Sequence, residues 1–308
     1  MDEYKIILDA DPGIDDAVAL AVLLQACKEL VALVVTTYGN IPLEKSTPNM
    51  LSLLALMDAS GIPVVEGAEQ PGPGNAIYED ASYIHGGDGI GGLQSSEMFQ
   101  ALKVPEAVKG DSLRIVYDTI VQAGQVVYIT LGPLTNLSEL IRRFPDIVDH
   151  LHQVVTMGGG IGLGNVTEFA EFNFYCDAES VQHVFASVPK LVLAPIDITT
   201  QVNFNLEQIA AIGAMGTPVA KAMEAMLVVN YDQCVSYGEP GATMHDSTAV
   251  LAALYPELFT FSVCGIHMEC ERERYGESTV TEGSNIHLMT KTNPEKLLQM
   301  IMDSIAAF

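Results

Sequence analysis

The stretch YKIILDADPGIDDAVALAVLL, residues 4–24, joins two apolar runs through a short segment that carries four aspartates. The first run, 4–8, predicts a buried strand, and Pro12-Gly13 predicts a tight turn. The second run, 17–24, predicts a helix that follows at once. Because a strand followed by a helix is the repeating unit of α/β proteins, we take this stretch as the first such unit.

The same alternation continues along the chain. Short runs rich in β-branched residues are separated mostly by helix-like stretches, and they are apolar on both alternating faces, as expected of strands buried on both sides. The further runs are 33–37, 64–66, 125–130, 153–157 and 190–194. We therefore predict an α/β fold with an open, mostly parallel, Rossmann-like central sheet and helices on both faces.

The C-terminal part departs from this alternation, because three short runs lie close together there and predict a small additional β region. These runs are 259–263, 279–282 and 286–289. A closing helix is expected over 294–307, with Asn293 as its cap. The stretch 66–92 is rich in Gly and Pro and lacks periodicity, and such long loops are usually functional. Without internal repeats or linkers, the chain reads as one domain, 1–308.

Composition narrows the class of protein. Of the 308 residues, 49% are hydrophobic and 17% charged, yet no apolar stretch reaches the roughly eighteen residues of a membrane span. The net charge of −25 repels a phosphate backbone, which excludes a nucleic-acid partner. The start, MDEYK, lacks the basic and apolar regions of a secretory signal. We expect a cytoplasmic protein without a membrane partner.

The cysteines are five in number and widely scattered, without C-x-x-C spacing. They are Cys27, Cys176, Cys234, Cys264 and Cys270. This pattern predicts neither a disulfide framework nor a zinc cage, and it favours buried small apolar side chains.

The aspartates of the opening stretch are Asp9, Asp11, Asp15 and Asp16. Four carboxylates at a junction between strand and helix repel one another unless a cation or hydroxyl donors lie among them. Asp9 and Asp11 are expected on the same side at the end of the strand, where open α/β sheets place their ligands. Asp15 and Asp16 start the helix, where capping is the ordinary alternative. The cluster as a whole predicts a metal site.

Two familiar aspartate motifs fit poorly. An EF-hand that begins at Asp9 needs Gly at its sixth position and Glu at its twelfth, where this chain has Ile14 and Leu20. A phosphatase of the haloacid dehalogenase type, with a nucleophilic Asp in D-x-D-x-Thr/Val, would have Gly13 at the last place of the motif. The phosphatase remains as a weaker alternative.

The pattern D-x-D-P-G-x-D-D resembles that of the inosine-uridine type nucleoside hydrolases, and further segments agree with this family in the same order. These segments are TTYGN at 36–40, HGGDG at 85–89, LGPLTN at 131–136, MGG at 157–159, GNVT at 164–167 with EFN at 171–173, and HD at 245–246. The resemblance implies a calcium-dependent enzyme of purine or pyrimidine salvage that cleaves the N-glycosidic bond of ribonucleosides to free base and ribose. It also implies a homodimer or homotetramer.

Cleavage of this bond builds positive charge on the sugar, delivers water to the anomeric carbon and leaves negative charge on the base. Carboxylates, a metal that holds the water and the diol, and an acid for the base would serve these three needs. Ligands that are all oxygen favour a hard cation, and the resemblance likewise implies Ca²⁺. Its implied ligands are Asp11, Asp16 through both oxygens, the backbone carbonyl of Leu131, and Asp246. Asp11 would also be the general base.

The resemblance implies the contacts of the ribose as well. Asp15 and Asn40 would bind the 2′-hydroxyl, and Asn165, Glu171 and Asn173 the 3′- and 5′-hydroxyls. Asn165 has an alternative as a turn residue after a glycine. Met157 would line the ribose pocket or simply end a core strand. Asp9 reads as a buried carboxylate that accepts backbone N–H bonds.

Two histidines are assigned to the base. His245 opens a predicted helix beside Asp246 and would act as the acid for the leaving group. His85 lies in a glycine-rich loop that could close over the substrate. Candidate stacking groups are Phe172, Tyr231 and Tyr237. The remaining histidines read as surface or packing residues: His150, His152, His183, His267 and His287.

The glycine run at 158–162 follows a predicted strand, but the next helix is expected only near Ala178, so dinucleotide binding is disfavoured. No Lys/Arg clamp accompanies any motif, which favours a ribonucleoside over a nucleotide. The alternative from another class is a non-catalytic, calcium-dependent nucleoside- or sugar-binding protein.

Overall fold

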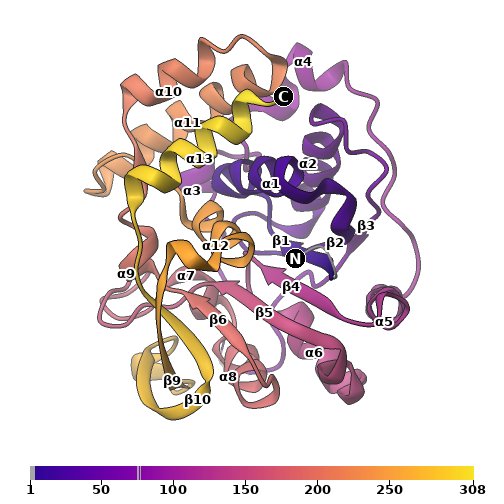
Figure 1. Cartoon of the computed structure of the whole chain (residues 1–308), viewed down its shortest axis with the longest axis vertical. Coiled ribbons are helices and arrows are strands. Elements are labelled where there is room, and N and C mark those ends of the chain that lie inside the picture. The colour runs from indigo at the N-terminus through magenta and orange to yellow at the C-terminus, as the bar shows by residue number, and fades with distance from the viewer. Residues whose placement is uncertain (1–3, 75, 77) are drawn as a thin grey trace.

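The computed structural model describes residues 4–74, 76 and 78–308, so Met1–Glu3 and two positions of the 66–92 loop lie outside the description. Its main sheet has eight strands in the order β3-β2-β1-β4-β5-β6-β10-β9 (Figure 1). The strands are β1 (Lys5–Ala10), β2 (Val31–Thr36), β3 (Val64–Glu66), β4 (Val126–Thr130), β5 (Leu151–Met157), β6 (Leu191–Ala194), β9 (Thr260–Met268) and β10 (Ser278–Lys291). A second sheet pairs β7 (Asn203–Phe204) with β8 (Ala242–Thr243).

Helices connect these strands. They are α1 (Ile14–Cys27), α2 (Leu43–Leu56), α3 (Ser82–His85), α4 (Glu97–Gln100), α5 (Ser112–Ala123), α6 (Thr135–Arg143), α7 (Phe172–Cys176), α8 (Ala178–Ser187), α9 (Ile196–Thr199), α10 (Leu206–Gly213), α11 (Pro218–Ser236), α12 (His245–Leu254) and α13 (Pro294–Ala306). Short 3-10 helices lie at Lys28–Leu30, Leu93–Ser95, Pro145–His150, Pro256–Leu258 and Arg272–Arg274. Every described helix is too short or too polar to span a lipid bilayer.

The sheet is covered by helices on both faces, as predicted. Along β1, Ile6 and Leu8 pack into one core cluster with α1, α11, α12 and α13. Ile7, between them, packs into a second cluster with α5, α6 and α8. Figure 1 shows these two helix layers on opposite sides of the strands. Alternate residues of this strand thus pack into two different hydrophobic cores, which explains why its residues 6–8 are all apolar.

The strand order places the carboxyl ends of two central strands at a switch point. The chain runs from β1 outward to β2 and β3, then returns to place β4 on the other side of β1. Both pairings of β1 are parallel, and Asp9 faces Thr130 across the β1–β4 pair. A crevice forms where successive connections diverge in this way, so the loops after β1 and β4 meet there.

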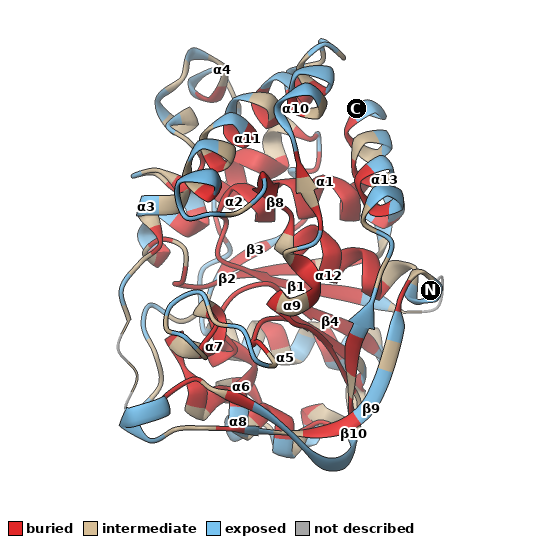
Figure 2. Cartoon of the chain, turned by 90° about the vertical axis from the view of Figure 1, so that its left-hand side faces the viewer, coloured by how far each residue is buried: buried red, intermediate tan, exposed pale blue. Residues whose placement is uncertain are grey.

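The C-terminal β region is confirmed, with one correction. The runs 279–282 and 286–289 were expected as separate strands, but both belong to the single strand β10, whose pairing with β9 shifts register between Thr281 and Ile286. This pair is antiparallel, whereas the other pairs of the main sheet are parallel. Figure 2 shows that the exposed part of the sheet lies on β9 and β10. The Asn293 side chain accepts from the Lys296 amide, which confirms the cap of α13.

Candidate active site

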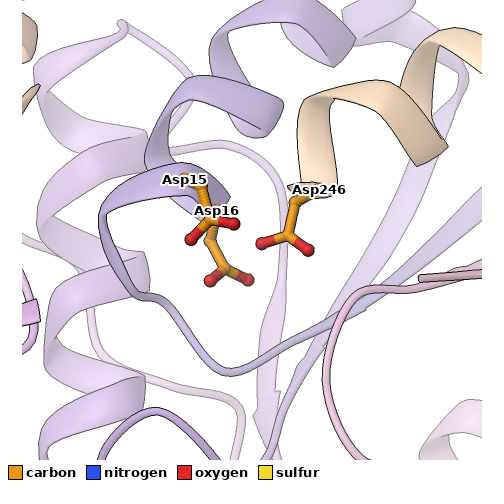
Figure 3. A group of neighbouring side chains, drawn as sticks. All are labelled: Asp15, Asp16 and Asp246. Carbon is orange, nitrogen blue, oxygen red and sulfur yellow. The ribbon is translucent and has the colours of Figure 1, made fainter. Parts of the chain in front are cut away.

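Three carboxylates from two helices converge at the switch point. Asp15 and Asp16 lie in the first turn of α1, and Asp246 lies in the first turn of α12. One carboxylate oxygen from each lies within 4.8 Å of the others, and all three residues are buried. Figure 3 shows Asp246 facing Asp15 and Asp16 across the gap between the helices. Two segments some 230 positions apart in the chain therefore share one acidic cluster, as the metal-site prediction requires.

Backbone and amide donors fix the position of Asp16. Its Oδ2 accepts from the Gly13 amide at 2.8 Å and from Asn40 Nδ2 at 3.1 Å. Gly13 precedes α1, and a Cβ there would lie 2.7 Å from Asn40 Nδ2 and 2.8 Å from His85 Nδ1. The glycine is therefore required by the close approach of these two side chains. The capping alternative is correct for Asp16, and it does not exclude ligation because Oδ1 stays unused.

Asp11 follows β1 and lies beside this cluster. Its Oδ2 accepts from the Asn40 amide at 2.6 Å, while its Oδ1 is buried without a hydrogen-bond partner among the described residues. Asp16 Oδ1 is likewise buried without a hydrogen-bond partner among the described residues. Buried carboxylate oxygens without partners are costly, and they mark a place for a missing ligand. With only oxygen donors present, the group fits a hard divalent cation.

The pKa values of the clustered carboxyl groups also favour a cation site. Burial, followed by the charge of Asp16, raises the pKa of Asp11 well above its usual range. Burial and then the charge of Asp15 do the same to the pKa of Asp246, and burial with the charge of Asp16 raises the pKa of Asp15 to about 7. A divalent cation reverses this balance, because its charge favours the ionised carboxylates.

Leu131 follows β4 and lines the same cavity. Its carbonyl accepts from Asn173 Nδ2 at 2.7 Å, which leaves the second lone pair of the oxygen available. Its predicted part in a metal site is therefore compatible with the hydrogen bonds it already makes.

The prediction for Asp9 was wrong in its details. This carboxylate is fully buried, but it accepts from side chains rather than from backbone amides: Tyr128 Oη at 2.8 Å and Asn136 Nδ2 at 2.9 Å. Burial raises its pKa to about 7. These two hydrogen bonds connect β1 to β4 and to α6, so the role of Asp9 is to hold these three elements together.

A cavity of about 340 Å³ opens above the carboxylates. The predicted site residues that line it are Asp15, Asn40, His85, Leu131, Met157, Asn165, Glu171, Phe172, Asn173, Tyr237, His245 and Asp246. Asp11 and Asp16 lie beneath this lining. Of the stacking candidates, Tyr231 is misplaced, since it packs against the main core. None of the five other histidines lines this cavity.

Several of these side chains also hold the walls of the cavity together. Glu171 caps α7 and accepts the amides of Gly159, Asn173 and Phe174 at 2.7, 2.9 and 3.1 Å. Asn165 Oδ1 accepts the Phe172 amide, seven positions further along the chain, at 2.9 Å, so Asn165 ties its loop to the start of α7 while it also lines the cavity. Burial raises the pKa of Glu171 to about 7.

The glycine run at 158–162 packs against the ring of Phe174. A Cβ on Gly158 or Gly159 would lie 2.4 or 2.6 Å from the ring of Phe174. The helix that carries this ring, α7, begins at Phe172, earlier than the expected start near Ala178. Glycine is therefore required there for packing.

Two histidines line the cavity, His85 beside the start of α1 and His245 at the start of α12. His85 Nδ1 accepts the Ile14 amide at 3.1 Å, so the proton of its neutral ring is on Nε2. Burial lowers its pKa to about 3, and burial lowers that of His245 to about 4. Both rings are therefore neutral near pH 7.

Comparison with known proteins identifies the family of this chain. The model of the inosine-uridine preferring nucleoside hydrolases matches residues 6–299. The chain belongs to this family. The non-specific ribonucleoside hydrolase RihC of Salmonella schwarzengrund is 34% identical over 282 residues, which cover 90% of this chain and 87% of that protein. The pyrimidine-specific ribonucleoside hydrolase RihA of Shewanella oneidensis is 33% identical over 315 residues, 98% and 96% of the two chains.

Solved structures of nucleoside hydrolases share the fold. A plant nucleoside hydrolase superposes with a TM-score of 0.91 at 24% identity, covering 99% of this chain and 100% of that one. The purine-preferring ribonucleoside hydrolase from Gardnerella vaginalis gives a TM-score of 0.90 at 23% identity over 98% of both chains. These likenesses confirm the predicted fold class.

This nucleoside hydrolase is an enzyme that cleaves the N-glycosidic bond of ribonucleosides. The findings support neither alternative. In the phosphatase interpretation Asp9 would be the nucleophile, yet both of its carboxylate oxygens are occupied by protein donors, Tyr128 Oη and Asn136 Nδ2. Sequence reasoning missed seven lining residues that lie outside the matched segments, at α3, in α11, and in or before β8: Ala81, Tyr83, Ile84, Asn230, Cys234, Glu239 and Thr243.

Proposed function

We propose that this nucleoside hydrolase uses a Ca²⁺ ion held by Asp11, Asp16, Asp246 and the Leu131 carbonyl, with Asp11 as the general base. The observation that carries the proposal is the pair of buried, unpartnered oxygens, Asp11 Oδ1 and Asp16 Oδ1, beside the cluster that Asp246 completes. When bound, such an ion would polarise a water molecule and hold the vicinal diol of the ribose.

Asp11 is built to take a proton. The Asn40 amide holds Oδ2, so Oδ1 is the oxygen left to accept a proton from the attacking water. The hydroxide that results bonds to the anomeric carbon as the C–N bond breaks. The electron pair of that bond leaves with the base, which is released after gaining a proton, and Asp11 returns its proton to solvent.

The ribose is placed by the oxygen-rich part of the cavity. In the proposal, Asp15 and Asn40 contact the 2′-hydroxyl, and Asn165, Glu171 and Asn173 contact the 3′- and 5′-hydroxyls. Asp15 and Asn40 come from the same loop-and-helix corner that holds Asp16, which supports a shared sugar site. A 2′-deoxyribose would leave polar groups of this corner unpaired, so ribonucleosides are preferred.

The proposal assigns the base to the aromatic and histidine side chains that line the cavity. Phe172 and Tyr237 offer faces for stacking, and His85 and His245 offer N–H groups to the acceptors of the leaving base. Since one relative is named non-specific and another pyrimidine-specific, we propose that both inosine and uridine are substrates.

The test is hydrolysis of inosine and uridine by the purified protein before and after treatment with EGTA. Free base and ribose should appear, the activity should fall with the chelator, and added Ca²⁺ should restore it. Hydrolysis that is unchanged in EGTA would overturn the metal assignment. Binding of both nucleosides without turnover would overturn the catalytic roles of Asp11 and His245.

A further inference from the structure

The ring of His245 has one protein partner, on the side away from the substrate. Its Nδ1 lies 2.7 Å from Thr199 Oγ1. Thr199 ends α9, directly after β6, and is fully buried. Among the described residues, His245 Nε2 makes no hydrogen bond, and the ring is partly exposed and lines the cavity. The substrate therefore meets the Nε2 side of the ring.

The backbone fixes the distance between these two side chains. The Met244 amide donates to the Val202 carbonyl at 2.8 Å, one residue before His245. Next to this bond, β7 and β8 pair Asn203 with Thr243, and the Thr243 hydroxyl donates to the Asn203 side chain at 2.6 Å. These hydrogen bonds hold the segment that follows Thr199 against the segment that precedes His245.

The direction of the Thr199–His245 hydrogen bond follows from the groups around it. Among the described residues, Thr199 Oγ1 has one hydrogen-bond partner, His245 Nδ1. If Nδ1–H donated to the hydroxyl, the buried O–H of Thr199 would have no acceptor, and an unmade buried donor is costly. If the hydroxyl donates to Nδ1, this buried donor is satisfied, and the N–H of the ring lies on the side that faces the cavity. The neutral ring then carries its proton on Nε2.

We propose that Thr199 is a positioning residue of the hydrolase: its hydroxyl holds His245 as the Nε2–H tautomer, so that this N–H faces the leaving base. The inference rests on the proposed role of His245. Negative charge develops on ring nitrogens and carbonyl oxygens of the departing base, and an N–H stabilises that charge. The other tautomer would present a lone pair to it instead. His85, fixed as Nε2–H by the Ile14 amide, shows the same arrangement beside the start of α1.

The test compares two substrates and three variants. Thr199→Val removes the hydroxyl at nearly constant shape, and Thr199→Ser keeps it. Thr200→Val is the matched control, because the Thr200 hydroxyl donates to the Ile196 carbonyl at 2.6 Å and does not reach the histidine. The substrates are inosine and p-nitrophenyl riboside, whose leaving group needs no hydrogen-bond donor.

Thr199→Val should lower kcat for inosine by about tenfold or more and leave p-nitrophenyl riboside within about twofold. Thr199→Ser and Thr200→Val should behave as wild type on both. Equal losses on the two substrates, or no loss with inosine, would overturn the inference. If wild type cleaves neither substrate, the proposed function itself is wrong.

Imidazole ¹⁵N NMR then judges the tautomer without turnover, with the His245 signals assigned from their absence in His245→Gln. A protonated Nε2 in wild type that becomes mixed in Thr199→Val supports the inference. A protonated Nδ1 in wild type overturns it.

Discussion

Replacing Asp11 with Asn should separate catalysis from stability. The amide has nearly the shape of the carboxylate, its oxygen can still accept the Asn40 amide, and its NH₂ takes the place of the unpartnered Oδ1. Loss of the general base should lower kcat about 10²- to 10⁴-fold, which corresponds to about 3–5 kcal/mol of the barrier. Loss of one charge beside Asp16, whose charge raises the pKa of Asp11, should leave the metal-free protein at least as stable.

The assay is steady-state cleavage of inosine together with thermal unfolding in EGTA. Asp9→Asn is the matched control, since Asp9 lies two residues away and is equally buried, but both of its oxygens already accept protein donors. Its new NH₂ would meet the donors of Tyr128 and Asn136, so this variant should lose Tm while it keeps most of its kcat. An Asp11→Asn enzyme with more than about a tenth of wild-type kcat would refute the role of Asp11 as the base.

Three further outcomes are expected. Ca²⁺ should raise the Tm of EGTA-treated wild type, since it binds only the folded cluster, and an unchanged Tm at millimolar Ca²⁺ would contradict the site. His245→Ala should lower kcat for inosine far more than for p-nitrophenyl riboside, and equal losses would count against an acid or donor role. Burial raises the pKa of Glu171 from 4.5 to about 7, so its contribution to stability is present below pH 4.5 and is lost as the pH rises through 7, by about 3 kcal/mol in total. In chemical denaturation between pH 5 and 8, the stability of wild type relative to Glu171→Gln should fall with rising pH, and a constant or growing difference would refute this.

The parts of the fold and site that the sequence predicts are those with local causes. The alternation of strand and helix follows from periodicity, and the switch point follows once β1 and β4 are neighbours. The acidic loop after β1 could therefore be placed at the ligand crevice before any contact was known. The donors to Asp9 could not be predicted, because Tyr128 and Asn136 lie 119 and 127 positions away in the sequence. They reach Asp9 only because the strands pair.

The strand β10 shows how packing overrides a local signal. Gly283 and Ser284 between the two runs read as a break, yet the strand continues because β9 accompanies it on both sides of the irregularity. A Cβ on Gly283 would lie 2.6 Å from the Cα of Gly265 on β9, and a Cβ on Gly265 would lie 2.6 Å from the Glu282 carbonyl oxygen. The two glycines therefore let the strands approach closely where the register shifts.

The hydrogen bonds within the protein leave two kinds of group free for a substrate. The carboxylates of Asp11 and Asp16 keep unpartnered oxygens, whereas His85 and His245 have Nδ1 occupied by a protein group and offer Nε2–H. Unpartnered acceptors suit a cation and the hydroxyls of a sugar, whereas N–H donors suit the acceptors of a base. A ribonucleoside whose base lay against the carboxylates would set acceptor against acceptor. We therefore expect the sugar to lie against the carboxylates and the base acceptors to lie against the two Nε2–H groups.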